Sequence, residues 1–118
     1  MGVPALPAPT AALLNTTARG LRDLEQLDRL FAALAHQSRR TILMVLHLRG
    51  GEMTSGAIAA RFDYSWPTIT RHLRVLEQAN LVHVELRGRE RIYRLNAEPL
   101  HHTARTWIDR FTRDYSGA

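Results

Sequence analysis

The sequence predicts a mainly α-helical domain with one small β-hairpin, in the order helix, helix, helix, helix, hairpin, helix. Apolar residues recur at helical spacing in five separate segments. Residues 82–95 instead alternate between apolar and polar on both sides of a glycine-containing turn. The chain has 118 residues, of which 45% are hydrophobic, so it can bury one core but is too short for two ordinary domains.

The N-terminal segment differs in composition from the rest of the chain. Three of the five prolines, Pro4, Pro7 and Pro9, lie among small residues there, so residues 1–18 are expected to form a flexible tail. The folded domain is then expected to cover residues 19–116. Its first helix, over about residues 21–35, has an apolar stripe made of Leu24, Leu27, Leu30, Phe31 and Leu34.

Polar residues predict where the next three helices begin. Ser38, Thr54 and Ser65 are each expected to cap a helix, Gly50-Gly51 to end the second, and Asn80 to end the fourth in a left-handed conformation. The apolar positions of the second helix cover most of its surface and are Ile42, Leu43, Val45, Leu46 and Leu48. The inward stripe of the fourth consists of Ile69, Leu73 and Leu76.

The third and fourth helices, joined by a short turn, form a predicted helix-turn-helix over about residues 54–78. The hairpin that follows, at about 82–95, has arginines around Gly88. A basic hairpin in this place is typical of the winged helix-turn-helix. The last helix, at about 98–115, has one apolar face made of Leu100, Ala104, Trp107, Ile108, Phe111 and Tyr115.

The positive charge is concentrated in the middle of the chain. The net charge is +5, all fixed positive charges are arginines, and residues 36–95 contain ten arginines against five acids. The two flanking segments are each neutral. A local basic surplus indicates a surface that binds a polyanion, and the alternative is an ordinary solvated basic face.

Several classes of protein are disfavoured by what the sequence lacks. It has no cysteine, which excludes disulfides, thiolate metal sites and cysteine-based redox sensing. It has no nucleophile motif, glycine-rich phosphate loop or clustered carboxylates, so we do not expect an enzyme. No apolar run approaches the roughly 20 residues of a membrane span, and we expect a cytoplasmic protein.

Three segments in this order resemble the ArsR/SmtB family of bacterial winged-helix repressors: LAHQSRRTIL at 34–43, SWPTITRHLRVL at 65–76 and GRERIYRL at 88–95. The resemblance extends from Leu30 to about Phe111. It implies a homodimer held by the first and last helices, and binding to an operator in double-stranded DNA. It also implies repression and, in many members, regulation by a metal or another inducer.

The family's metal sites are not matched by this sequence. Where family metal sensors have two cysteines near the start of the third helix, this chain has Thr54 and Gly56. A second family site pairs histidines eleven residues apart in the last helix, but Thr112 and Arg113 follow His101 and His102 at that spacing. We therefore expect no metal and no cofactor. Six histidines leave open a sensor of a histidine-bound metal or a small molecule, although His72 is expected to pack in the core.

The predicted DNA contacts follow from this arrangement. The fourth helix is expected to enter the major groove and to read bases with Trp66, Thr68, Thr70, Arg71 and Arg74. Ser65, at the start of this helix, is also expected to contact DNA. Phosphates are expected to be held by Ser38, Arg39, Arg40, Arg87, Arg89 and Arg91. For Trp66 two interpretations stay open, contact with DNA or packing against Tyr64.

The predicted dimer interface uses the two outer helices. Its residues are Leu24, Leu27, Phe31, Leu100, Ala104, Trp107, Ile108, Phe111 and Tyr115. The alternative is that the last helix packs against the first within one chain, and the two arrangements are compatible. A winged helix that binds only proteins is the rival function, and it predicts no positive charge on the wing.

Overall fold

The computed structural model describes the backbone of residues 11–112 and the side chains of residues 20–112. The helices are α1 (Ala11–Leu34), α2 (Gln37–Leu48), α3 (Ser55–Ala59), α4 (Trp66–Gln78), a π-helical turn η1 (Leu100–Ala104) and α5 (Arg105–Asp109). The strands are β1 (Glu52–Thr54), β2 (Val82–Arg87) and β3 (Glu90–Leu95). This order confirms the predicted mainly helical fold with a β-hairpin, and the structure adds one strand.

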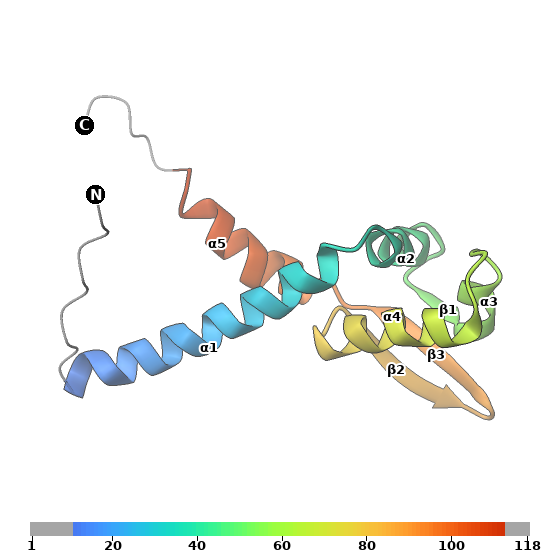
Figure 1. The fold of residues 1–118 in the computed structure, drawn as a ribbon, viewed down its shortest axis with the longest axis horizontal. Coiled ribbons are helices and arrows are strands. Elements are labelled where there is room, and N and C mark those ends of the chain that lie inside the picture. The colour runs from blue at the N-terminus through green and yellow to red at the C-terminus, as the bar shows by residue number, and fades with distance from the viewer. Residues whose placement is uncertain (1–10, 113–118) are drawn as a thin grey trace.

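The molecule is elongated, with extents of 54 × 36 × 27 Å. Figure 1 shows α1 and α5 at one end of the long axis, and α3, α4 and the β2–β3 hairpin at the other. The core between them lies where α1, α2 and α4 meet the sheet. Its fully buried side chains are Leu30, Ile42, Leu46, Ile58, Ile69, Leu73, Leu76, Leu81 and Val82.

The first helix is longer than the sequence predicted. It begins at Ala11, so residues 11–18 are helical where a tail was expected. The prolines end at Pro9, and Ala11, Ala12, Leu13 and Leu14 are strong helix formers that allow the helix to start directly after them. Residues 1–10 lie outside the described residues.

The start of α2 is capped differently from the prediction. His36, not Ser38, is the N-cap, and its Nδ1 accepts a hydrogen bond of 3.2 Å from the Ser38 N–H. Ser38 lies inside the first turn and is buried. Leu48, predicted among the core positions of α2, is 73% exposed because the helix turns that side away from the core.

The helix-turn-helix follows the predicted caps. Thr54 caps α3 by accepting a hydrogen bond from the Ala57 N–H at 3.0 Å, and Ser65 caps α4 by accepting one from the Thr68 N–H at 3.4 Å. Asn80 has a φ of 59° after α4, as expected for a left-handed terminator. The third helix, α3, is short and ends at Ala59.

The hairpin is part of a three-stranded antiparallel sheet with the order β1-β3-β2. The sequence analysis missed β1, because three residues are too few to show a periodicity. Gly50 and Gly51, with φ values of 89° and 96°, turn the chain so that Met53 pairs with Tyr93. The base of the wing is therefore joined to the region that precedes α3.

The last helix is less regular than predicted. The Arg105 N–H donates to the Leu100 carbonyl, which gives one wide π-helical turn and shifts the residues after it around the helix. Trp107 still contacts α1 through Phe31, with ring centroids 5.5 Å apart. Regular helix ends at Asp109, and the predicted interface residue Tyr115 lies outside the described residues. None of the helices described is long and apolar enough to cross a membrane.

Candidate nucleic-acid interface

Helix α4 has one buried face and one exposed face. Ile69, Leu73 and Leu76 are at most 2% exposed and anchor the helix on the core. On the outer side Thr70, Arg71 and Arg74 are exposed. Among the side chains that the structure describes, no hydrogen bond or ion pair engages Arg71 or Arg74. Both guanidinium groups are therefore available to a ligand.

Trp66 lies at the first position of α4 and is 56% exposed. Tyr64 does not cover it, because Tyr64 stacks on Phe62 with ring centroids 5.6 Å apart and an interplanar angle of 11°. Of the two interpretations made for Trp66, packing against Tyr64 is not the arrangement found. The indole is free to contact a partner.

Two polar residues at the start of α4 serve the helix itself. The hydroxyls of Ser65 and Thr68 lie 2.9 Å apart, and Ser65 also accepts the Thr68 N–H. Thr68 is half-buried. Thr68 was predicted to read bases, and Ser65 both to cap α4 and to contact DNA. In the structure the two residues together fix the first turn of α4.

The two phosphate candidates nearest the core, Ser38 and Arg39, make internal contacts. The Ser38 hydroxyl donates to the Tyr64 hydroxyl at 2.9 Å, and the residue is 7% exposed. Arg39 is half-buried and donates from Nε to the Ala33 carbonyl at 2.8 Å and from Nη2 to the Ala32 carbonyl at 3.0 Å. We therefore leave Ser38 and Arg39 out of the contacts proposed below.

Arg40 differs from its neighbour. One nitrogen, Nη1, donates to the Leu34 carbonyl at 2.7 Å, while the side chain remains exposed. A guanidinium has five N–H donors, so Arg40 can hold the end of α1 and still contact a phosphate.

His72 lies on α4 beneath the exposed face and is 7% exposed, as predicted for a packing residue. Its Nδ1 is 3.3 Å from Nη1 of Arg39, and its ring centroid is 4.6 Å from that of His36. Burial lowers the pKa of His72, and the charges of His36, Arg39 and Arg71 lower it further. These effects favour the neutral form of the His72 imidazole.

The arginines of the wing, which is the β2–β3 hairpin, differ in whether they pair with carboxylates. Arg87 lies 3.4 Å from Glu52 and 3.2 Å from Glu85, and Arg94 lies 3.3 Å from each of the same two carboxylates. The hydrogen bonds that Arg87 and Arg94 donate lower the pKa of Glu52, and those that Arg87 donates to Glu85 and Glu52 raise the pKa of Arg87. Arg89 and Arg91 are exposed and have no such partner among the described side chains.

Two features of this surface were not predicted from the sequence. Arg61 lies exposed in the turn between α3 and α4, and a lone arginine in that turn was the signal available. The four-residue ion-pair network was missed because Glu52 belongs to the unpredicted strand β1. It neutralises Arg87, which was predicted to bind phosphate.

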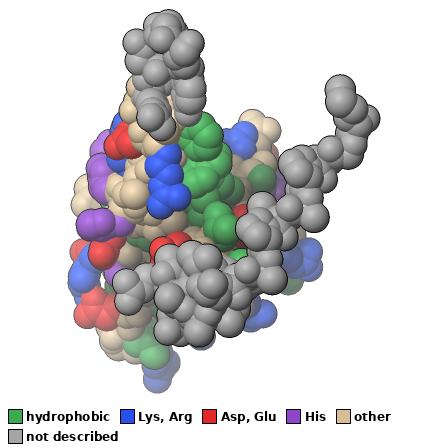
Figure 2. All heavy atoms as spheres, turned by 90° about the vertical axis from the view of Figure 1, so that its left-hand side faces the viewer, with side chains coloured by type: hydrophobic (Ala, Val, Ile, Leu, Met, Phe, Trp, Pro, Cys, Tyr) green, Lys and Arg blue, Asp and Glu red, His purple; other side chains and the backbone are tan. Residues whose placement is uncertain are grey.

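The predicted dimer residues fall into two groups. Leu27 and Ala104 are 5% and 6% exposed and pack inside the chain, and Phe31, Leu100 and Trp107 are half-buried. Leu24, Ile108 and Phe111 are 49%, 45% and 60% exposed, and Leu21 nearby is 54% exposed. Figure 2 shows hydrophobic side chains gathered on the end of the molecule that carries α1 and α5. We call Leu21, Leu24, Ile108 and Phe111 the apolar end patch.

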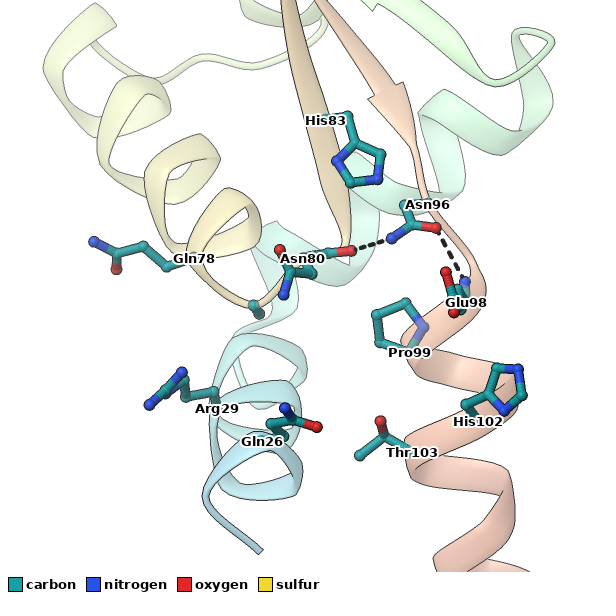
Figure 3. Close-up of a pocket in the computed structure, with 11 residues that line it drawn as sticks. Gln26, Arg29, Gln78, Asn80, His83, Asn96, Glu98, Pro99, His102 and Thr103 are labelled. Carbon is teal, nitrogen blue, oxygen red and sulfur yellow. Dashed lines mark hydrogen bonds between the residues drawn. The ribbon is translucent and has the colours of Figure 1, made fainter. Parts of the chain in front are cut away.

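A polar cavity of about 370 Å³ lies between α1, the end of α4 and the start of the last helix (Figure 3). Its lining includes Arg29, His83, Glu98 and His102 together with several amide side chains. Asn96 braces it by donating to the Asn80 carbonyl at 2.7 Å and accepting from the Glu98 N–H at 3.3 Å. No group of three or more metal-ligating side chains is found among the residues described.

Comparisons with known proteins agree with this arrangement. A helix-turn-helix domain family matches residues 34–85. The transcriptional repressor SdpR of Bacillus subtilis is 38% identical over 74 residues, which are 63% of this chain and 80% of the repressor.

Two solved structures are similar to this chain over about three quarters of its length. An ArsR family transcriptional regulator is 31% identical with a TM-score of 0.68 over 75% of this chain and 88% of its own. A homodimeric winged helix-turn-helix DNA-binding domain from Mycobacterium bovis is 26% identical with a TM-score of 0.64, over 79% and 85% of the two chains. The chain belongs to the ArsR family of winged helix-turn-helix proteins and is a DNA-binding transcriptional regulator.

Proposed function

We propose that the protein is a homodimeric repressor that binds a near-palindromic operator with α4 in the major groove. The observation that carries the proposal is the outer face of α4, where Arg71 and Arg74 are exposed and unpaired among the described side chains while the opposite face is buried. Such a helix is rigidly held and can present its arginines to base edges. This function needs no catalytic residue. Because its proposed partner is chromosomal DNA, the protein would act in the cytoplasm.

The exposed side chains divide into base-reading and phosphate-binding groups. Arg71 is the best candidate for a bidentate contact to guanine, and the methyl group of Thr70 suits thymine. Trp66 would contact sugar or a thymine methyl at the entrance of the groove. Arg40, Arg89 and Arg91 would hold phosphates, which position the protein without specifying sequence.

The dimer would form through the apolar end patch. Its four large apolar side chains are 45–60% exposed, and apolar side chains gathered in one exposed patch are typical of a protein–protein interface. The homodimeric Mycobacterium bovis domain supports the same assembly for this chain. Because the patch and α4 lie toward opposite ends of the long axis, a dimer leaves both recognition helices free.

The test is a selection of bound sequences from a random duplex library, followed by fluorescence anisotropy at several salt concentrations. We expect a selected near-palindrome to bind far more tightly than random DNA, with affinity that falls steeply as salt rises. Arg71→Ala should remove about 1–3 kcal/mol of discrimination at one base pair per half-site. Arg22→Ala, an exposed arginine on α1, is the matched control and should change nothing.

Two results would count against the proposal. If no sequence is enriched, the chain does not read bases. If Arg71→Ala weakens all duplexes equally, Arg71 binds phosphate and the specificity comes from other residues. Repression itself is tested by transcription in vitro from a promoter that overlaps the selected sequence, where added protein should reduce the transcript.

Sensing of an effector is the second candidate function, and the polar cavity favours it because it touches both α1 and the end of α4. Titration with Zn²⁺, Ni²⁺ and Co²⁺ tests the metal form of this idea. Since no three-ligand group is present among the described residues, we expect operator affinity to stay unchanged. Release of the operator at stoichiometric metal would make the protein a metal sensor.

A further inference from the structure

We propose that Arg39 and His72 form a proton-dependent tie that holds the recognition helix α4 against the end of α1, so that Arg39 is a positioning residue for DNA reading. The inference rests on the proposed role of α4. It concerns two residues that do not face the DNA, and it predicts that operator affinity depends on pH through a buried imidazole.

The guanidinium of Arg39 contacts two helices at once. Its Nε and Nη2 donate to the Ala33 and Ala32 carbonyls at 2.8 and 3.0 Å, and its Nη1 lies 3.3 Å from His72 Nδ1. Those carbonyls belong to the last turn of α1, where the Ala32 carbonyl also accepts the Ala35 N–H at 3.3 Å. The C-terminal end of a helix also attracts a cation. One planar guanidinium thus joins α1 to α4.

The tie requires one particular protonation state of the His72 imidazole. Arginine has only donors, so His72 Nδ1 must accept and its proton must sit on Nε2. The ionisable groups that face His72 are His36, with ring centroids 4.6 Å apart, Tyr64 at 6.4 Å, Arg39 and Arg71. Burial and these neighbouring charges lower the pKa of His72 from its usual 6.5. A protonated His72 would turn a donor toward Arg39 and break the tie.

The tie lies where three helices meet. Arg39 lies in the first turn of α2, and His36 caps that turn through Nδ1. The end of α1, the start of α2 and the middle of α4 therefore meet at one cluster. Because α1 carries half of the proposed dimer contacts, the tie sets the position of α4 relative to the dimer.

The direction of the pH effect follows from the lowered pKa. At a pH between the lowered pKa of folded His72 and 6.5, His72 binds a proton when the protein is unfolded or when the contact with Arg39 is broken. In the tied form it binds none. The tied arrangement is therefore fully stable above 6.5 and loses stability as the pH falls below it.

The first measurement is made on the protein without DNA. Nitrogen and carbon NMR of the histidine rings in the full chain should show His72 in the Nε2-protonated tautomer, titrating below 6.5. A His72 that is protonated on Nδ1, or that titrates at or above 6.5, overturns the tie even if operator binding follows the proposed function.

The second arm measures affinity for the selected duplex and for random DNA. His72→Phe keeps a buried ring without an acceptor, and Arg39→Lys keeps the charge without the three-way contact. At pH 7.5 each should lower specific affinity about tenfold with the salt slope and the random-DNA affinity unchanged, while circular dichroism shows a folded protein. Equal loss on both duplexes would mean that the two residues affect the fold or contact phosphate, and would overturn the positioning role.

The control variants isolate the imidazole responsible. His72→Asn keeps an acceptor near the position of Nδ1 and cannot be protonated, so its affinity should fall less than that of the wild type between pH 7.5 and 5.5. His36→Asn keeps a good N-cap and should retain the wild-type pH dependence. If His36→Asn removes that dependence and His72→Asn does not, the proposal is wrong.

Discussion

Arg39 and Arg40 are neighbours in the sequence and have different environments in the fold. Arg39 is half-buried and its guanidinium contacts α1 and α4, whereas Arg40 is exposed and uses one donor on the Leu34 carbonyl. The sequence predicted that both would hold phosphate, because residue type and charge are all that a pattern records. Which arginine turns inward depends on the angle at which α2 leaves α1, and that angle is a property of the packed core.

At the residue scale, the Ser38–Tyr64 hydrogen bond gives a stability prediction. It links the first turn of α2 to the turn before α4 at 2.9 Å, and Ser38 is buried. Ser38→Ala and Tyr64→Phe should each lower the free energy of unfolding by about 0.5–1.5 kcal/mol, measured in urea. The double variant should cost less than the sum, since each single change already removes the bond. Full additivity would show that the hydroxyls do not interact.

The elements whose bounds were predicted best are those with polar caps. Thr54 and Ser65 cap α3 and α4 as expected, and Asn80 ends the recognition helix. These signals act over three or four residues, so the local sequence contains them. Strand β1 and the π-helical turn η1 were not predictable in this way, because β1 exists only through its partner β3 and η1 depends on contacts with α1.

At the element scale, the ion-pair network predicts how the wing meets DNA. Glu52→Gln removes one of the two carboxylates that pair with Arg87 and Arg94, so the wing gains positive charge. We expect affinity for random DNA to rise a few-fold at low salt, with a steeper salt dependence measured by anisotropy. The hydrogen bonds from Arg87 and Arg94 lower the pKa of Glu52 below its usual 4.5, so acidification should resemble the variant only below that pH.

Glu98→Gln is the control for this prediction, because it changes the net charge equally but lies by the polar cavity, away from the wing tip. It should leave the affinity for random DNA nearly unchanged. Equal gains from both variants would mean that total charge, and not the wing, governs the effect.

At the scale of the whole molecule, the long axis separates two surfaces. The apolar end patch lies with α1 and α5, and the exposed arginines of α4 and the wing lie toward the other end. To read two half-sites one turn of the double helix apart, the dimer must hold its two recognition helices about 34–36 Å apart. Leu24→Glu should then give a monomer in analytical ultracentrifugation, while Leu48→Glu on the exposed side of α2 should not.

The central claim is tested most directly by the stoichiometry and spacing of operator binding. The selected duplex is compared with the same duplex carrying five extra base pairs between its half-sites, with bound mass measured by ultracentrifugation. We predict two protomers on the first duplex, and about 100-fold weaker binding or more when the insertion or Leu24→Glu prevents both half-sites from being engaged together. A single protomer bound with full affinity, unaffected by the insertion and by Leu24→Glu, would contradict the account.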